Sequence, residues 1–243
     1  MKSRLTLIHL AGNTVLLALG YYWLGLPESR TGALAWSAFI ALAIVAAACA
    51  LYGAAFISCA LPPLGWRRAL ITAARRLPAL ILCAIFIGAI YLLLDRAHDL
   101  LRTPSFRVAS WLTLKFRRPV RPAAVLRDVD FALTAIRWAV IPLLTLPLFA
   151  GVAILGHRGF RCIGLLARSA RYWVLTPLLL LCALWVPFKI LGWTPHSSSF
   201  AIEMLSFIAR AAAAYALFTA AGLAIVYLTA TATPRFTQSK TAP

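Results

Sequence analysis

The most constraining feature of this sequence is a series of long apolar runs, each with few or no charges over about twenty residues. Such a run matches the roughly 30 Å hydrocarbon core of a bilayer when it is helical, because an α-helix rises about 1.5 Å per residue. The runs are rich in Leu and Ala and do not alternate in polarity, which favours helices over the strands of a membrane barrel. We therefore predict six membrane-spanning helices, at residues 5–26, 33–61, 77–94, 138–156, 172–191 and 200–233.

The composition excludes an ordinary soluble domain. Hydrophobic residues make up 63% of the 243 residues and charged residues 12%, about half of the roughly 25% expected for a soluble domain. Too little polar surface would remain to cover a water-soluble fold. Helices satisfy their own backbone hydrogen bonds in lipid. The expected fold class is an all-α, polytopic transmembrane helical bundle with interfacial amphipathic helices, forming one integral membrane domain over residues 1–243.

The first apolar run has two interpretations. Residues 5–26 follow Lys2 and Arg4, and a basic start before an apolar run is also typical of a cleaved signal peptide. The run is long for a signal peptide, however, and the aromatic residues at 21–23 resemble an interfacial belt. We expect an uncleaved first helix.

Two of the predicted spans carry ridges of small residues at multiples of four. Such ridges let helix backbones approach closely in lipid, where van der Waals packing drives association. We expect these two helices to form the tightly packed centre of the bundle. The ridges comprise Ala38, Ala46, Ala50, Ala54 and Ser58 in the second span, and Ala212, Ala216, Ala220 and Ala224 in the sixth.

Two short basic segments, at residues 66–77 and 157–171, are amphipathic when read as helices. A basic face opposite an apolar face suits a helix that lies in the membrane interface. Each segment carries two arginines seven residues apart before an apolar run, which hints at an internal repeat. Chance explains this spacing as well, since interfacial helices commonly repeat at seven.

The stretch 95–137 is the one long segment that hydropathy leaves unexplained. It holds nine of the 24 basic residues and four of the six acidic residues. Apolar and basic residues alternate over 106–116, which predicts an extended piece. Pro122 can begin a helix that runs to Arg137 with one apolar face. We expect this stretch to form an ordered cap loop over the non-cytoplasmic ends of the spans.

Charge predicts orientation only in part. Six spans place both termini on one side, and the segments on that side hold 12 Lys and Arg residues against 11 on the other. All six acidic residues fall opposite the termini, so one face is purely basic, and such a face suits anionic cytoplasmic lipid. We predict a multi-pass protein of the cell inner (plasma) membrane with both termini cytoplasmic. The rival is a re-entrant third segment, which would keep 95–137 inside.

The formal net charge of +18 raises the question of nucleic acid. In so apolar a chain, Lys and Arg are better explained as loop residues that set orientation and contact anionic headgroups. The expected partners are the lipid bilayer, anionic phospholipid headgroups and a membrane-protein partner, with no nucleic acid.

No catalytic motif or pair of carboxylates within a span appears in the sequence, so we expect a non-enzymatic protein without a cofactor. The cysteines lack the paired spacing of a metal site or a disulfide framework, and we expect neither. His9 and Asn13 share a face of the first span, and we expect them to hydrogen-bond each other or a neighbouring helix. The five cysteines are Cys49, Cys59, Cys83, Cys162 and Cys182.

One set of polar residues near the turn between spans five and six is a candidate ligand-binding site. It comprises Lys189, His196, Glu203 and Arg210. Ionisable groups at membrane depth are costly, so they need a partner or a function. One interpretation is a structural network, with the two cations reaching for the interface and Glu203 as their counter-charge. The alternative is a pocket for an anionic amphiphile, which would make the protein a transporter or a lipid-handling protein.

Overall fold

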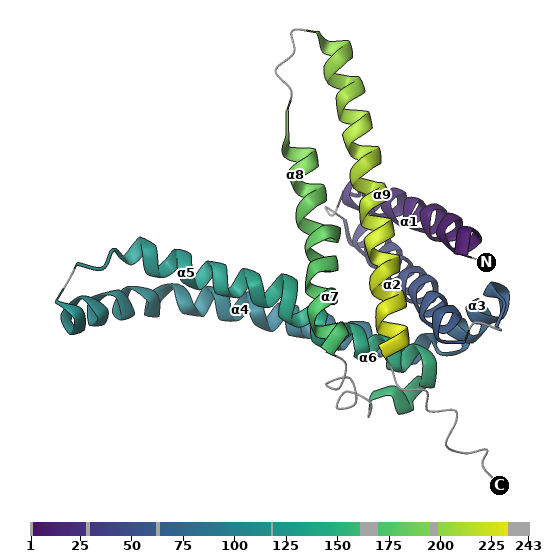
Figure 1. The fold of residues 1–243 in the computed structure, drawn as a ribbon, viewed down its shortest axis with the longest axis horizontal. Coiled ribbons are helices and arrows are strands. Elements are labelled where there is room, and N and C mark those ends of the chain that lie inside the picture. The colour runs from purple at the N-terminus through teal and green to yellow at the C-terminus, as the bar shows by residue number, and fades with distance from the viewer. Residues whose placement is uncertain are drawn as a thin grey trace. The chain divides into compact units, whose positions relative to one another are not determined.

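The computed structural model describes residues 2–27, 30–61, 64–117, 119–160, 170–194 and 199–232, and these ranges are almost entirely helical, with no strand. Six helices within them are long and apolar enough to cross a membrane. The predicted all-α, multi-span fold class is confirmed. The elements (Figure 1) are α1 (Lys2–Leu24), α2 (Thr31–Ala60), α3 (Trp66–Arg75), α4 (Leu77–Phe116), α5 (Pro122–Ala135), η1 (Ile136–Val140), α6 (Ile141–Leu155), α7 (Ala170–Leu180), η3 (Leu181–Trp185), α8 (Val186–Gly192) and α9 (Phe200–Ala232).

Two of the apolar stretches are longer than the spans predicted for them. The third reaches from Leu77 to Leu101 and the fourth from Pro122 to Phe160. Because α4 continues beyond residue 94, the third apolar stretch is longer than the predicted span 77–94. The side of the membrane on which the termini lie stays a prediction.

Two short π-helical turns, η1 and η3, interrupt the long helices just before prolines. Pro142 follows η1 and Pro187 follows η3, each by two residues. Proline lacks an N–H and its ring clashes with the carbonyl four residues earlier, and a π turn is one way for a helix to accommodate this. Pro147 and Pro177 instead lie inside α6 and α7.

The chain divides into two compact units, which are described separately. Unit 1 comprises residues 1–84 and 146–243, and unit 2 comprises residues 85–145. In unit 1, α2 packs against α1, α3 and α9, and α9 also packs against α7, η3 and α8. The prediction that the two Ala-rich helices meet is thus confirmed, while their membership of one integral domain with unit 2 stays a prediction.

The small-residue ridge predicted for α9 is wrong in detail. Ala212, Ala216 and Ala220 are exposed, whereas Ala214 and Ala221 are buried. Residues four apart advance about 400° around a helix, so a ridge at this spacing drifts by about 40° at each step. Residues seven apart stay closer to one face, and Ala221 packs in a core cluster with Leu180, Ala183 and Ile225.

The predicted amphipathic segment at 66–77 is confirmed as the short helix α3. Its Ala69 and Ala73 are fully buried against Ala54 and Ile57 of α2. Its remaining surface carries the exposed Arg67, Arg68 and Arg75 together with Leu70 and Ile71. Of the second predicted amphipathic segment, residues 161–169 lie outside the described residues.

The junction between α3 and α4 also holds the end of α6. Arg76 Nη1 donates to the carbonyl oxygen of Ala153 at 2.6 Å and also to that of Ile154. A cation is favourable beside the last carbonyls of a helix, where the partial charge is negative. Gly156 follows with φ +65°, the left-handed conformation that commonly terminates a helix. Burial lowers the pKa of the Arg76 guanidinium.

Unit 2 is an antiparallel helical hairpin. Its first arm is α4 from Ile85, and its second arm is the continuous run of α5, η1 and the start of α6 (Figure 1). The tip is closed by a hydrogen bond from the Val120 amide to Thr113 Oγ1 at 3.1 Å. Pro122 begins α5, as the sequence predicted.

The extended piece predicted at 106–116 is wrong, because this stretch is the last part of α4. Partly buried Leu112 and Thr113 lie three and four residues after buried Ala109, which is a helical rather than a strand spacing. Phe106 and Leu114 are exposed, so their alternation with basic residues does not mark a buried face. The stretch 95–137 is therefore mostly a helical hairpin and not a loop, and its role as a cap stays a prediction.

Candidate functional site

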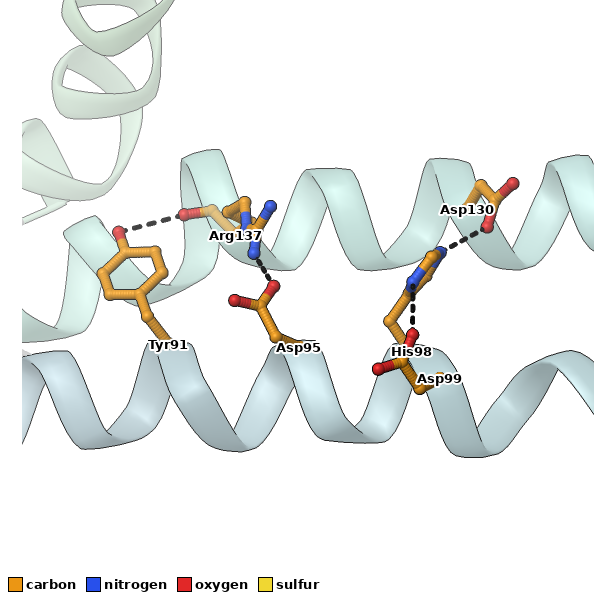
Figure 2. A network of polar contacts seen from close by, with 6 residues as sticks. All are labelled: Tyr91, Asp95, His98, Asp99, Asp130 and Arg137. Carbon is orange, nitrogen blue, oxygen red and sulfur yellow. Dashed lines mark hydrogen bonds and ion pairs between the residues drawn. The ribbon is translucent and has the colours of Figure 1, made fainter. Parts of the chain in front are cut away.

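A network of polar contacts joins the two arms of the hairpin, and Figure 2 shows the side chains that take part in it. Tyr91 donates its hydroxyl hydrogen to the Arg137 carbonyl oxygen at 3.2 Å. The Arg137 guanidinium forms an ion pair with Asp95. One turn further along α4, His98 Nε2 lies 2.9 Å from Asp130 Oδ1, and His98 Nδ1 lies 3.9 Å from Asp99 Oδ1.

The spacing of these residues follows from helix geometry. Tyr91, Asp95 and His98 are four and then three residues apart, so they share one face of α4. Asp130 and Arg137 are seven apart and share one face of the opposite arm. The order is reversed between the arms, as an antiparallel pair requires. We call this set of residues, with Asp99, the brace.

The brace is partly solvated. The side chain of His98 is 33% exposed and that of Asp95 is 56% exposed. Exposed ion pairs contribute only about 0–1 kcal/mol each, because water screens them and ordering the side chains costs entropy. The brace is thus better suited to selecting one register of the two arms than to supplying much stability. Across the described residues, no group of three or more His, Cys, Asp or Glu is arranged to hold a metal ion.

Sequence reasoning missed the brace. Helical periodicity puts Asp130 and Arg137 on the same polar side of α5 as Arg127 and Thr134, but the structure turns Asp130 and Arg137 toward α4 and leaves the other two exposed. The usable signal was the polar spacing from Asp95 to His98, which becomes meaningful only if residues 95–116 are read as helix.

A second feature of the hairpin is an exposed apolar face on α4. Its side chains include Leu114, which is 80% exposed, Leu100 at 74% and Trp111 at 55%. Lys115 Nζ lies 4.6 Å from the centroid of the Trp111 ring, a cation–π contact. We call this the outer α4 face, defined by Leu100, Leu101, Arg107, Val108, Trp111, Leu114 and Lys115.

The predicted site near the turn between spans five and six is built around Arg210 of α9. Arg210 Nη1 donates to the Leu191 carbonyl oxygen at 3.1 Å, and Nε donates to the Ser206 carbonyl oxygen at 3.2 Å. Its guanidinium carbon lies 5.9 Å from the centroid of the Trp193 ring. Leu191 is in the last turn of α8, so Arg210 neutralises a helix end and ties α8 to α9.

The other members of the predicted site are not gathered around Arg210. Lys189 is exposed, with Nζ 5.5 Å from the centroid of the Trp185 ring. Glu203 is exposed and forms no ion pair with any described residue, so the predicted counter-charge role is not observed. His196 lies outside the described residues. Whether these residues bind a ligand or form a structural network stays a prediction.

The predicted polar pair of the first span lies inside unit 1. Asn13 Oδ1 accepts a hydrogen bond from the Tyr52 hydroxyl of α2 at 3.0 Å, so its predicted role in helix packing is confirmed. His9 is buried, and its ring centroid lies 5.5 Å from that of Tyr52 and 5.9 Å from that of Trp66. His9 Nε2 has no hydrogen-bond partner within the described part of the chain.

Comparison with known proteins gives no relative: no family model, no curated protein and no solved structure matches this chain. What can be stated about its class comes from the helices themselves. Six of them, counted over the described ranges, have the length and apolar composition of membrane spans. The chain is accordingly a multi-pass membrane protein.

Proposed function

We propose that the protein is a non-enzymatic accessory component of a membrane, in which the spans anchor the unit 2 hairpin and the hairpin binds a partner protein. The observation that carries this proposal is the combination of a brace between the arms and an uncovered apolar face on α4. A hairpin with a defined register presents its outward side chains in a constant pattern, which recognition requires.

The exposed face supports binding because a contiguous set of apolar side chains is normally covered, by lipid within a membrane span or by a partner outside it. Leu100, Val108, Trp111 and Leu114 all lie on one side of α4 and are all exposed. Burying one such side chain against a partner stabilises a complex by about 1.5–3 kcal/mol. Tryptophan is also enriched among the residues that dominate binding energy.

Site-specific photo-crosslinking in native membranes tests the proposal. A photoreactive residue at position 114 should give a discrete protein adduct, because Leu114 is the most exposed of these side chains. Phe131 of α5 provides a matched control, since it is apolar and 74% exposed but belongs to the other arm. Lipid adducts alone, or equal adducts at both positions, would count against a partner that recognises α4. Transport or conversion of a substrate by the purified protein would overturn the proposal.

A second candidate function is the binding of an anionic amphiphile, such as a phospholipid, beside α8 and α9. It is favoured by the two cation–aromatic pairs, Lys189 with Trp185 and Arg210 with Trp193. Such pairs suit a membrane interface with anionic headgroups. His196 and Glu203 complete the predicted site.

Native mass spectrometry in detergent tests this second function. The wild-type protein should retain anionic lipid, and Lys189→Gln should lower the retained fraction, because Lys189 is exposed and makes no ion pair with a described residue. Arg210→Gln should lower it further. Arg127→Gln in unit 2 is the control for a general loss of positive charge. Equal retention in all four proteins would exclude the lipid site.

A further inference from the structure

The short helix α3 carries three exposed arginines that the fold does not use. Arg67, Arg68 and Arg75, which we call the α3 arginines, form no ion pair with a described residue. The neighbouring Arg76 differs from them, because it binds the carbonyl oxygens at the end of α6. The sequence has no Asp or Glu from residue 29 to residue 94, so no carboxylate nearby in the chain neutralises the α3 arginines.

The surface of α3 has an apolar part beside its basic part. Successive residues are about 100° apart around a helix, so the side that follows the buried alanines of α3 carries Leu70 and Ile71. Both are exposed, Leu70 by 39% and Ile71 by 46%. Arg68 and Arg75 lie seven residues apart on the side beyond Ile71, and Arg67 lies between Leu70 and Ile71. An exposed apolar side therefore adjoins an exposed basic side.

The connections of α3 hold it at the ends of two membrane spans. Only residues 61–65 separate it from α2 and only Arg76 separates it from α4, and both neighbours contain apolar stretches long enough to cross a membrane. The helix α2 has no charged residue, and the first one in α4 is Asp95. The buried alanines of α3 pack on Ala54 and Ile57, in the last two turns of α2. The bilayer surface therefore lies beside α3.

We infer that the α3 arginines form a binding surface for anionic phospholipid headgroups of the protein's own bilayer. Leu70 and Ile71 lie against the acyl chains, and Arg68 and Arg75 bind phosphate oxygens at the level of the headgroups. A guanidinium presents paired N–H donors that match the oxygens of a phosphate. A basic amphipathic helix beside a membrane span suits anionic lipid for this reason. The inference goes beyond the proposed partner-binding function and does not depend on it.

The apolar part of the surface separates lipid from other anionic occupants. Nucleic acid and free phosphate supply negative charge but no apolar surface to cover Leu70 and Ile71. A second copy of α3 would bring like charges together, which is unfavourable. A phospholipid supplies both parts in one molecule, and it already surrounds the ends of the spans.

Native mass spectrometry of the full-length protein in detergent, with added phosphatidylglycerol or phosphatidylcholine, tests the role of charge. The wild-type protein should retain phosphatidylglycerol in preference. Arg67→Gln combined with Arg68→Gln and Arg75→Gln should lower the affinity for phosphatidylglycerol about tenfold or more, since each basic residue near an anionic surface strengthens the attraction by about fivefold. Lysine at the same three positions should keep most of the affinity, because the charge persists.

The matched control removes three other exposed arginines that form no ion pair with a described residue, by Arg30→Gln, Arg127→Gln and Arg171→Gln. Both triple variants have the same net charge, and both keep Lys189 and Arg210. Only the α3 variant should lose its preference for phosphatidylglycerol. An equal loss in the two variants, or an unchanged affinity in the α3 variant, would overturn the inference.

Photo-crosslinking from position 71 in native membranes identifies the occupant independently. A photoreactive residue in place of Ile71 should give lipid adducts, and the share of anionic phospholipid among them should fall when the α3 arginines are replaced by Gln. A discrete protein or nucleic-acid adduct, or the absence of lipid adducts, would refute the inference. The result is separate from crosslinking at position 114, so this inference and the proposed function can fail independently.

Discussion

The two units of this protein hold their helices together in different ways. In unit 1, α2 packs through Gly53, Ala54 and Ala55, whose small size lets neighbouring helices approach the backbone. In unit 2, the two arms are joined by the brace, and α4 leaves a row of large apolar side chains uncovered. The difference teaches that close packing and polar registration serve different ends. Close packing of small residues holds α2 against its neighbours in unit 1, whereas polar side chains set the register of the two arms in unit 2.

The largest effect is expected from overpacking the small-residue contact of unit 1. A Cβ atom at Gly53 would lie 2.9 Å from Leu80 Cδ1 and 3.4 Å from Ala73 Cβ. Gly53→Leu should therefore lower the free energy of unfolding by about 3 kcal/mol, at the upper end of overpacking effects. Thermal unfolding in detergent measures this. Gly88→Leu is the matched control, because a Cβ at Gly88 meets nothing within 4 Å. Equal losses in the two variants would contradict the packing contrast.

A smaller effect is expected from the arginine that binds the end of α6. Arg76→Ala removes a charged donor from the Ala153 and Ile154 carbonyls. Hydrogen bonds to charged groups contribute about 1.5–3 kcal/mol, and partial exposure of Arg76 places the expected loss near 1–2 kcal/mol. Arg75→Ala, at an exposed neighbouring position, should change stability little. The contact is not stabilising if both variants unfold at the same temperature.

A double-mutant cycle examines the brace itself. Asp95→Asn and Arg137→Gln, alone and combined, should give a coupling energy below about 1 kcal/mol, since the pair is partly solvated. Asp128→Asn serves as a control because Asp128 is exposed and forms no ion pair with a described residue. A coupling of several kcal/mol would mean that unit 2 depends on its polar contacts as strongly as unit 1 depends on packing.

The smallest effect on stability is expected on the outer α4 face. Leu114→Ser should change the free energy of unfolding by no more than about 0.5 kcal/mol, because Leu114 is 80% exposed and supports no core. The same substitution should weaken partner crosslinking from position 111. A clear loss of stability would show that Leu114 is covered within the protein and would remove the contrast between the units.

The sequence predicted correctly those helices that are specified by residues within the helix itself. The start of α5 at Pro122 follows from the fixed φ of proline. The helix α3 follows from the spacing that puts its arginines on a face opposite its apolar residues. Residues 106–116 were misread because an apolar–basic alternation fits a strand when its partners are unknown. The inward position of Ala109 is a property of the hairpin and not of the alternation.

The candidate sites show the same limit: the sequence predicted which residues need a partner but not which residues those partners are. The sequence alone indicated that Arg210 needs a partner, but not that the Leu191 carbonyl would be that partner. It placed Asp130 and Arg137 on one helix face, but not against Asp95 and His98. Partners that are 32 to 42 residues apart in the chain depend on where the hairpin turns.

The sequence by itself determined the class of this protein and the number of its apolar helices, because the thickness of a bilayer translates directly into the length of an apolar run. Only the tertiary structure decided that the charged stretch 95–137 is mostly a braced hairpin with one uncovered face. The physical reason is that a run length is a one-dimensional quantity, whereas the pairing of Asp95 with Arg137 requires two helices to meet in space.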